Sequence, residues 1–390
     1  MKILHLIDSA GLYGAEVMLL HLIAEQIKQG LQPIIASIGE KGIDEKPLEK
    51  EAKKRGYRVK KFRMAPGPNY LGALNILRFA WHEGIDILHS HGYKGNILFG
   101  FIPGKIRRIP IITTVHGYTS TGNGLRRMRA YEWLDSKALR FMDAVVFVSN
   151  AMKSDSRFKH LNPSKVHVIH NGIPLTTSDS PSHAPSFSAL DAADLDQHIL
   201  DFCTNTFTLG SIGRLSPEKG YIYLVRALKI IRDKGHDVRL VIIGEGGERP
   251  KLEQEISRLG LRNHVLLPGY RANASAYLPY FDVFVLPSLT EGLPMTILEA
   301  IRAKVPIVAT RVGGIPDILQ EEKSCLFVRC KDPESLAGAL IRFLEDPTLG
   351  KSLTDNASDV LSTQISINMT SMRYKQVYQK VGLPPKLWTV

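Results

Sequence analysis

The chain has 390 residues, of which 44% are hydrophobic and 23% charged, so it is a folded protein of two or three domains and not a disordered chain. Its three cysteines, Cys203, Cys325 and Cys330, are too few and too scattered for a disulfide scaffold or a four-cysteine zinc site, and they fit a reducing compartment. We expect no transmembrane span, because no 18-residue window is sufficiently apolar, and no signal peptide, because the N-terminus turns polar too soon.

The net charge of +12 lies entirely in the first half of the chain. Residues 1–170 carry 26 Lys and Arg against 14 Asp and Glu, whereas residues 171–390 carry 24 of each. A basic first half indicates an anionic partner such as phospholipid, a phosphorylated lipid or nucleic acid. A charged surface that only keeps the protein soluble would give the same distribution.

Short apolar runs alternate with helical patterns through the first half. The first run, residues 2–7, leads through a glycine turn into a helix that carries apolar residues from Val17 to Ile27 and stops at Gly30. The predicted strands are residues 2–7, 32–38, 85–89, 111–115, 144–148 and 166–169. Strands that alternate with helices predict a parallel sheet covered on both faces.

The pattern stops at residues 175–205, which begin with a stretch rich in Ser, Pro, Asp and Ala and predict a linker or an exposed insertion. It then resumes with a helix over residues 221–234. The predicted strands of this second half are residues 206–212, 238–243, 265–267, 283–286, 307–309 and 325–328. A short amphipathic helix over residues 372–381 is expected to cross back onto the first lobe.

The sequence therefore predicts an α/β protein of two doubly wound, Rossmann-like lobes that face each other across a deep cleft. The predicted boundaries are 1–174 for the first lobe, 175–205 for the linker, 206–370 for the second lobe and 371–390 for the returning helix. Ligands of such sheets bind beyond the carboxyl ends of the strands, so we expect a site built from loops of both lobes.

Two glycine-containing turns are candidates for binding phosphate. Gly11-Leu-Tyr-Gly14-Ala-Glu16 follows the first strand and opens a helix, where glycine lets a phosphate approach backbone N–H groups. Gly213-Arg214-Leu-Ser-Pro-Glu-Lys219-Gly220 occupies the equivalent turn of the second lobe, and its two cations could clamp a diphosphate. An ordinary glycine turn and a solvated basic loop remain the alternatives.

Two glutamates eight residues apart form the strongest motif, in the segment from Ser288 to Ala300. Glu291 is predicted in the loop before a helix, and Glu299 on the helix, which Pro294 suits as a first-turn residue. Carboxylates accept hydrogen bonds from neighbouring sugar hydroxyls, so the pair could hold two sugars of one ligand. A helix cap and an ordinary helix glutamate are the alternative interpretation.

Two further patterns are weaker. His89 and His91 lie two apart at a strand end, but without further ligands they do not predict a metal site. With Tyr93 and Lys94 they are better candidates for contacts to an acceptor. Asp194-Leu-Asp196 has the spacing of a metal-binding motif but lies in the polar insertion, which indicates an ordinary surface position.

In combination, the Glu-x7-Glu element, the Gly-Arg…Lys-Gly loop, Ile243-Gly-Glu-Gly246 and Val312-Gly-Gly-Ile-Pro316 resemble the retaining GT-B-fold glycosyltransferases of family 4, the group 1 class. The resemblance covers nearly the whole chain and is weakest over 175–205. It implies transfer of a sugar from a nucleotide-diphosphate sugar by front-face substitution, without a metal or other cofactor.

The resemblance also implies roles for individual residues. Arg214 and Lys219 would contact the donor diphosphate, Glu299 the ribose, Glu291 the transferred sugar, and His116 the donor sugar and the acceptor. The implied catalytic residues are His116, Arg214, Lys219 and Glu291. The implied donor-binding residues are Gly14, Gly213, Gly244, Gly269, Tyr270, Gly292, Leu293, Met295, Thr296 and Glu299. The acceptor-side candidates are His91, Tyr93 and Lys94.

We therefore expect a hexosyl- or N-acetylhexosaminyltransferase of cell-envelope, capsular or exopolysaccharide assembly. Its donor would be a UDP-, GDP- or ADP-sugar, and its acceptor a saccharide or a lipid-linked sugar. A cytoplasmic protein, peripheral on the inner face of the membrane through its basic first lobe, fits this interpretation. A nucleotide-sugar epimerase of the same fold and a basic nucleic-acid-binding protein are the alternatives. The second lacks a recognisable binding module, so we expect no nucleic-acid partner.

Overall fold

The computed structural model describes residues 1–382 except 10, 68, 118–125 and 176–194. The described residues form two compact units. The first contains Met1–Pro174 together with the last described helix, α15 (Ile367–Gly382), and the second contains the described residues between them up to Ser366. Each unit has its own sheet and its own core, and each is treated separately below.

The first unit is built on a seven-stranded sheet in the order β3-β2-β1-β4-β5-β6-β7, with each neighbouring pair parallel. Its strands are β1 (Lys2–Ile7), β2 (Gln32–Glu40), β3 (Val59–Met64), β4 (Ile87–Ser90), β5 (Ile111–Val115), β6 (Ala144–Phe147) and β7 (Val166–Val168). The central strands are buried along almost their whole length, which is why they appear in the sequence as unbroken apolar runs.

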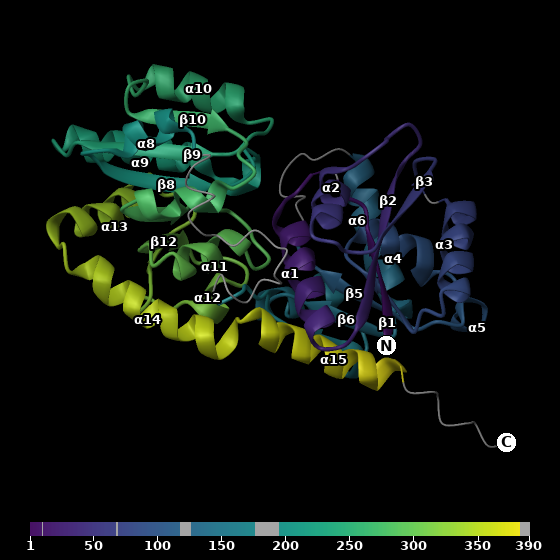
Figure 1. The fold of residues 1–390 in the computed structure, drawn as a ribbon. Coiled ribbons are helices and arrows are strands. Elements are labelled where there is room, and N and C mark those ends of the chain that lie inside the picture. The colour runs from purple at the N-terminus through teal and green to yellow at the C-terminus, as the bar shows by residue number, and fades with distance from the viewer. Residues whose placement is uncertain (10, 68, 118–125, 176–194, 383–390) are drawn as a thin grey trace. The chain divides into compact units, whose positions relative to one another are not determined.

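Helices connect these strands and cover the sheet (Figure 1). They are α1 (Gly14–Lys28), α2 (Pro47–Lys54), α3 (Tyr70–His82), α4 (Tyr93–Gly100), α5 (Gly104–Arg107), α6 (Arg126–Ala138) and α7 (Asn150–Lys153), with 3₁₀ turns at Leu139–Phe141, Ser156–Phe158 and Pro163–Lys165. The core packs strand residues such as Leu4, Leu88 and Val145 against residues of α3 and α4 such as Ile76 and Leu98.

The second unit repeats the design with a six-stranded sheet in the order β10-β9-β8-β11-β12-β13, again parallel. Its strands are β8 (Phe207–Ile212), β9 (Val238–Ile243), β10 (Val265–Gly269), β11 (Val283–Leu286), β12 (Ile307–Thr310) and β13 (Leu326–Val328). Its helices are α8 (Gln197–Cys203), α9 (Tyr221–Asp233), α10 (Arg249–Arg258), α11 (Met295–Arg302), α12 (Ile315–Ile318), α13 (Pro333–Glu345) and α14 (Leu349–Gln364), with 3₁₀ turns at Pro217–Lys219 and Ala274–Tyr280.

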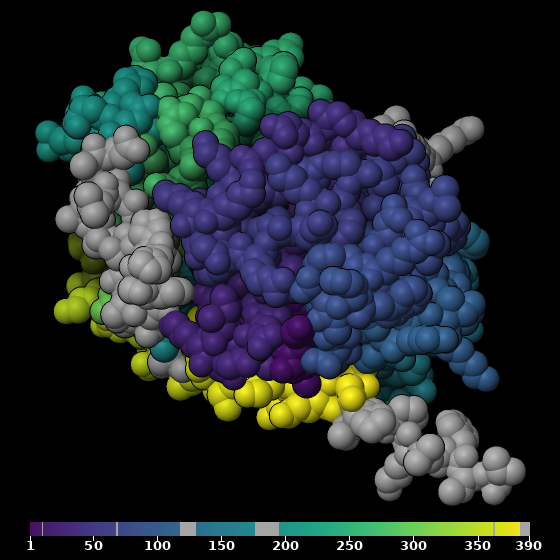
Figure 2. Space-filling view, turned by 45° about the vertical axis from the view of Figure 1, so that its right-hand side comes forward, coloured from purple at the N-terminus to yellow at the C-terminus, as the bar shows by residue number. Residues whose placement is uncertain are grey.

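Helix α15 completes the first unit from the far end of the sequence. Its first backbone N–H, at Ile367, donates to the carbonyl of Ile173 at 3.0 Å, and its side chains Tyr374 and Tyr378 are fully buried. It packs beside α1, and the yellow end of the chain lies against the purple N-terminal segment in Figure 2. The helix begins five residues earlier than the sequence pattern indicated.

The predicted fold class, two doubly wound parallel α/β units, is confirmed. Two elements were not anticipated. Strand β3 lies within a basic segment and pairs only with β2, so Lys60, Lys61 and Arg63 are tolerated at the edge of the sheet. Helix α8 lies inside the segment 175–205, for which the sequence predicted a linker or an exposed insertion without a helix.

The helices in the described part of the chain are each too short or too polar to cross a membrane.

Candidate active site

Both sheets reverse their strand order at one point, between β1 and β4 in the first unit and between β8 and β11 in the second. The loops at such a reversal diverge to opposite faces and leave room for a ligand beyond the strand ends. Most of the site residues expected from the sequence lie on these loops or on the helices that follow them. Gly14 starts α1 after β1, His91 follows β4, residues 213–219 follow β8, and Glu291 follows β11.

In the second unit, an ion pair joins the two loops that flank the reversal. The Lys219 ammonium donates to Glu291 Oε1 at 2.6 Å, and the Ser288 hydroxyl donates to the same oxygen at 2.6 Å. The Lys219 and Glu291 side chains keep 18% and 10% of their surface exposed. The structure therefore brings together two residues 72 positions apart that the sequence had placed in one site.

Arg214 is anchored by Glu218, a residue that sequence reasoning did not single out. Arg214 Nη2 donates to Glu218 Oε1 at 2.8 Å, and the Ser216 hydroxyl donates to the same oxygen at 2.7 Å. Burial opposes ionisation of Glu218, but these hydrogen bonds outweigh it and lower the pKa of its carboxyl. Nearly half of the Arg214 side chain stays exposed, so the guanidinium is held at one end and accessible to an anion.

Glycines connect the loops that follow β8, β9 and β10. The Gly213 N–H donates to the Ile243 carbonyl, and the Gly244 N–H to the Gly269 carbonyl, each at 3.0 Å. A Cβ on Gly244 would lie 1.9 Å from the Gly213 carbonyl oxygen. Gly244 thus allows close backbone packing. Contact of Gly213, Gly244 and Gly269 with a donor stays a prediction. Tyr270, the next residue, is 48% exposed.

Gly313 supports the loop that carries Glu291. Its φ is +58°, and a Cβ there would lie 2.1 Å from the Glu291 carbonyl oxygen. The next N–H, of Gly314, donates to the Gly292 carbonyl at 2.6 Å. The Val312-Gly-Gly segment therefore supports the backbone at Glu291, and this close contact explains why glycines occupy these positions.

Helix α11 begins one residue later than expected, because Pro294 is the residue before the helix and not part of its first turn. Leu293 and Met295 are buried, and the hydroxyl of Thr296 is buried without a partner among the described residues. Glu299 lies on α11, where burial raises the pKa of its carboxyl although Arg302 acts in the opposite direction. An acceptor group in such surroundings favours binding hydroxyl donors.

In the first unit, Asp8 at the end of β1 binds two lysines. Lys46 donates to Asp8 Oδ1 at 2.7 Å, and Lys94, an acceptor-side candidate at the start of α4, donates to Oδ2 at 2.8 Å. Burial of Asp8 opposes ionisation, but these two lysines outweigh it and lower the pKa of the carboxyl. Asp8 and Lys46 were missed because they are far apart in the sequence. Tyr93 is 43% exposed.

His116 follows β5 directly, and its Nε2 lies 3.3 Å from Nδ1 of His91. The structure therefore joins two candidates that the sequence had placed on different strands. Both belong to a larger cluster with His5 and His89, in which His5, His89 and His91 are buried and His116 is partly exposed. His5, His89 and His91 bring their ring nitrogens within 4.8 Å of one another, close enough for a metal ion. His5 is a polar residue inside an apolar strand, and that signal was available in the sequence.

In the Asp194-Leu-Asp196 motif, the second aspartate has a structural role. Asp196 accepts from the N–H of His198 at the start of α8 and from Arg271 Nη2 at 2.6 Å. Its partner in the motif, Asp194, lies outside the described residues.

The structure is thus a two-unit α/β protein with charged side chains on the loops at both strand-order reversals. Comparison with known families then identifies the class. The family described as Glycosyltransferase Family 4 matches residues 13–177, and the family described as Glycosyl transferases group 1 matches residues 195–360. The chain belongs to the group 1, family 4 type of glycosyltransferase, as the sequence resemblance indicated.

Individual relatives agree with this assignment. The chain is 29% identical over 282 residues to the UDP-Gal:alpha-D-GlcNAc-diphosphoundecaprenol alpha-1,3-galactosyltransferase of Escherichia coli, covering 71% of this chain and 70% of that one. It is 24% identical over 304 residues to the alpha-D-kanosaminyltransferase of Streptomyces kanamyceticus, covering 76% and 77%. The crystal structure of Anabaena HepE in complex with UDP-glucose matches with a TM-score of 0.80 and 22% identity, covering 97% of this chain and all of that one, which confirms the GT-B fold.

Replacing Gly313 by alanine should destabilise the loop that holds Glu291. The substitution adds a left-handed backbone penalty and a contact with the Glu291 carbonyl, together about 2 kcal/mol or more. We expect a melting temperature roughly 4–8 °C lower, measured by differential scanning fluorimetry.

Gly247→Ala is the matched control, since no atom of the described residues lies within 4 Å of its Cβ position. Equal effects of the two substitutions would contradict the role given to Gly313.

Proposed function

We propose that this enzyme transfers a hexose or N-acetylhexosamine from a UDP-sugar to a saccharide, free or lipid-linked, with retention at the anomeric carbon. The observation that carries the proposal is the Lys219–Glu291 pair across the strand-order reversal of the second unit, with Arg214 on the same loop as Lys219. The E. coli relative is named for a UDP-galactose donor and a lipid-diphosphate acceptor, and HepE was crystallised with UDP-glucose. Both support a UDP-sugar donor.

The cations of the second unit would stabilise the leaving group. When the bond to the sugar breaks, negative charge builds up on the diphosphate, and Arg214 and Lys219 would neutralise it. The bond from Lys219 to Glu291 fixes the ammonium before a donor arrives, so little reorganisation is required during the reaction. This is the role that a divalent cation has in metal-dependent transferases, and we propose that no metal is needed here.

Glu291 is better suited to hold the sugar than to attack it. Both hydrogen bonds from Lys219 and Ser288 converge on one of its oxygens, which fixes the carboxylate and reduces its nucleophilicity. The other oxygen would then accept from sugar hydroxyls. We propose front-face substitution, in which the leaving diphosphate takes the proton of the acceptor hydroxyl and the protein supplies positioning.

The first unit would approach an anionic membrane through its basic surface, and its ion pairs indicate which cations could make the contact. The cluster around Lys53 and Arg55 is locally neutralised, since Lys53 pairs with Glu45 at 2.6 Å and Arg55 with Glu51 at 2.7 Å. The side chains of Arg126, Arg127 and Arg129 lie outside the described part of the structure.

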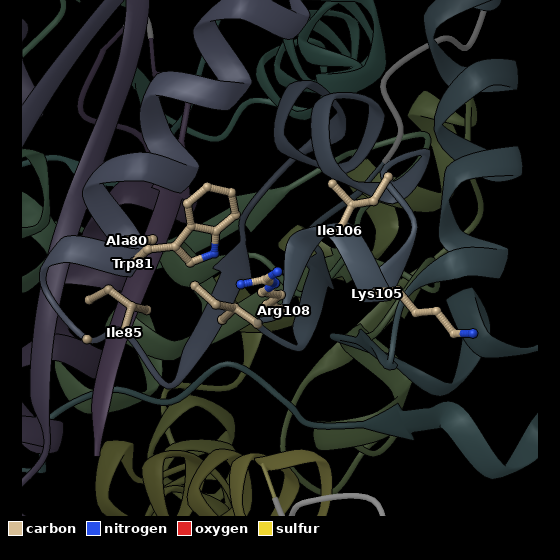
Figure 3. A pocket seen from close by; sticks show the side chains of 8 residues that line it. Ala80, Trp81, Ile85, Lys105, Ile106 and Arg108 are labelled. Carbon is tan, nitrogen blue, oxygen red and sulfur yellow. The ribbon is translucent and has the colours of Figure 1, made fainter.

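A groove between α3 and α5 combines apolar and basic groups (Figure 3). Trp81 and Ile106, which line it, are 40% and 59% exposed. Lys105 and Arg108 line the same groove and form no ion pair with the described residues. Apolar side chains beside unneutralised cations suit the interface of an anionic bilayer, and we propose that this groove, here called the α3–α5 groove, meets the membrane.

Donor binding without metal is the direct test of the function. In a thermal-shift panel with EDTA present, a UDP-sugar at 100 times its Kd should stabilise the full-length protein by about 2.7 kcal/mol. GDP- and ADP-sugars should shift the melting temperature less. A metal requirement for the shift, or a preference for GDP or ADP, would overturn this part of the proposal, and conversion of the donor without any acceptor would indicate an epimerase.

Lys219→Ala should reduce turnover much more than stability. Loss of one cation at the leaving diphosphate is expected to lower kcat/KM at least about 100-fold, measured by release of nucleoside diphosphate. Lys229→Ala is the matched control, because Lys229 pairs with Asp233 one turn away on the surface of α9. Near-normal activity of Lys219→Ala would remove Lys219 from the site.

The double variant Lys105→Ala/Arg108→Ala should bind anionic vesicles about 30-fold more weakly, since each cation near such a surface contributes about 1 kcal/mol. Cosedimentation with phosphatidylglycerol vesicles measures this, and vesicles of phosphatidylcholine alone should bind little. Lys53→Ala/Arg55→Ala is the control and should change binding little. A reversed order of the two double variants would move the membrane contact back to α2.

A further inference from the structure

Four histidines form a connected cluster inside the first unit, beneath the ends of β1, β4 and β5. His5 and His89 are completely buried, and His91 is 6% exposed. The rings lie in series, with centroids 5.2 Å apart for His5 and His91 and 5.6 Å apart for His91 and His116. Helix α1 contributes Gln26 to the cluster, and α15 contributes Tyr374 and Tyr378. The cluster therefore depends on elements from both ends of the sequence.

A line of hydrogen bonds runs from α1 to His116. Gln26 Oε1 lies 2.9 Å from His5 Nε2, His5 Nδ1 lies 2.9 Å from His91 Nε2, and His91 Nδ1 lies 3.3 Å from His116 Nε2. At its far end, the Gln26 amide nitrogen donates to the Tyr378 hydroxyl at 3.0 Å. Each ring in the line thus bonds through one nitrogen to the neighbour on the Gln26 side. His5 and His91 also bond through their second nitrogen to the neighbour on the His116 side.

Burial keeps these rings neutral. It lowers the pKa of His5 and of His116 to about 4, and it lowers the pKa of His91 well below its usual value. A neutral imidazole has one N–H donor and one lone-pair acceptor. In a line of neutral rings, the direction of one hydrogen bond therefore determines the direction of the next.

Gln26 sets that direction, because an amide oxygen can only accept. His5 must then carry its proton on Nε2, so its Nδ1 accepts from His91 Nε2–H. By the same step, His91 Nδ1 accepts from His116 Nε2–H, and His116 Nδ1 is left with a lone pair. That atom is buried and has no hydrogen-bond partner among the described residues.

We propose that Gln26 and His5 are positioning residues that act through His91 to hold His116 in the tautomer with an unprotonated Nδ1. His116 then accepts a hydrogen bond from a hydroxyl group of the donor sugar or the acceptor, and this last step rests on the function proposed above. The opposite order of protons would place a buried N–H on His116 Nδ1 with no acceptor among the described groups, a costly arrangement.

The rest of the cluster satisfies its own hydrogen bonds on a second branch. His89 Nδ1 lies 2.8 Å from the Tyr378 hydroxyl, and His89 Nε2 lies 2.8 Å from the Thr114 hydroxyl, which in turn reaches Tyr374 at 2.9 Å. All six ring nitrogens of His5, His89 and His91 are therefore within hydrogen-bond distance of a partner. A metal ion held by these three rings would have to displace several of these bonds, so the geometry favours the relay over a cation site.

Long-range ¹H–¹⁵N correlation spectra of histidine-labelled, full-length protein test the tautomer directly. In the wild type without ligand at pH 7, His116 should show one protonated nitrogen, Nε2. The signals are assigned by the spectrum of His116→Asn. Protonation of Nδ1 instead would overturn the proposal, as would coordination shifts of the three buried histidines on addition of Zn²⁺.

Variants test whether Gln26 determines the tautomer of His116. Gln26→Met keeps the length of the side chain but removes the acceptor, and it should convert the His116 signals to a mixture of two tautomers. Tyr374→Phe is the matched control, since it removes a buried hydroxyl on the second branch and should leave His116 unchanged. A single unaltered His116 tautomer in Gln26→Met would overturn the proposal.

A second pair of variants covers the case in which Gln26→Met fails to fold. His5→Leu removes the acceptor for His91, whereas His5→Asn places an amide oxygen where Nδ1 stood. The single His116 tautomer should be lost in His5→Leu and kept in His5→Asn. Identical spectra of the two variants would contradict the proposed line of hydrogen bonds. In the folded variants, kcat should fall at least about tenfold when the tautomer is lost, while KM for the donor changes little.

Different results would contradict the proposed sugar transfer and the proposed roles of Gln26 and His5. The tautomer is measured on the protein without substrate, so an intact relay with no sugar transfer from any nucleotide-sugar would contradict the proposed function alone. Normal transfer with a His116 tautomer insensitive to Gln26 and His5 would contradict the relay alone.

Discussion

Parallel pairing of the strands is the constraint on which the rest of the structure depends. Because the strands of each sheet run the same way, their carboxyl ends meet at one edge, and every loop that follows a strand is collected there. The reversal of strand order then separates two neighbouring loops at one point. In the second unit, the bond between Lys219 and Glu291 spans this point.

The same arrangement explains why several motif residues hold the loops instead of a ligand. Loops that converge at one edge must pack backbone against backbone, and a side chain on Gly244 or Gly313 would occupy the place of a carbonyl oxygen. Glu218 and Asp8 play a comparable part with side chains, since each carboxylate fixes a cation before any anion is bound. The cost of ordering these cations is thus met during folding, which is the usual basis of electrostatic preorganisation.

The fold was largely accessible from the sequence, because buried parallel strands are unbroken apolar runs bounded by glycine and polar turns. Strand β3 was not, since an edge strand needs only one neighbour and tolerates Lys60, Lys61 and Arg63. The loop motifs placed Arg214, Lys219 and Glu291 in one unit, and the structure joins the last two. The sequence alone could not have placed Asp8 beside Lys46 and Lys94, or Gln26 beside His5 and Tyr378, because such pairs depend on how distant segments pack.

Helix α15 has a consequence for the synthesis of the protein. The ribosome makes the sheet of the first unit first, but the two tyrosines that cover its buried histidines lie about 200 residues further along the chain. At 5–20 residues per second, the nascent first unit waits on the order of 10–40 s for its last helix. During that interval the second unit can fold independently, while the polar cluster of the first stays partly uncovered. The unit made first is therefore the unit completed last.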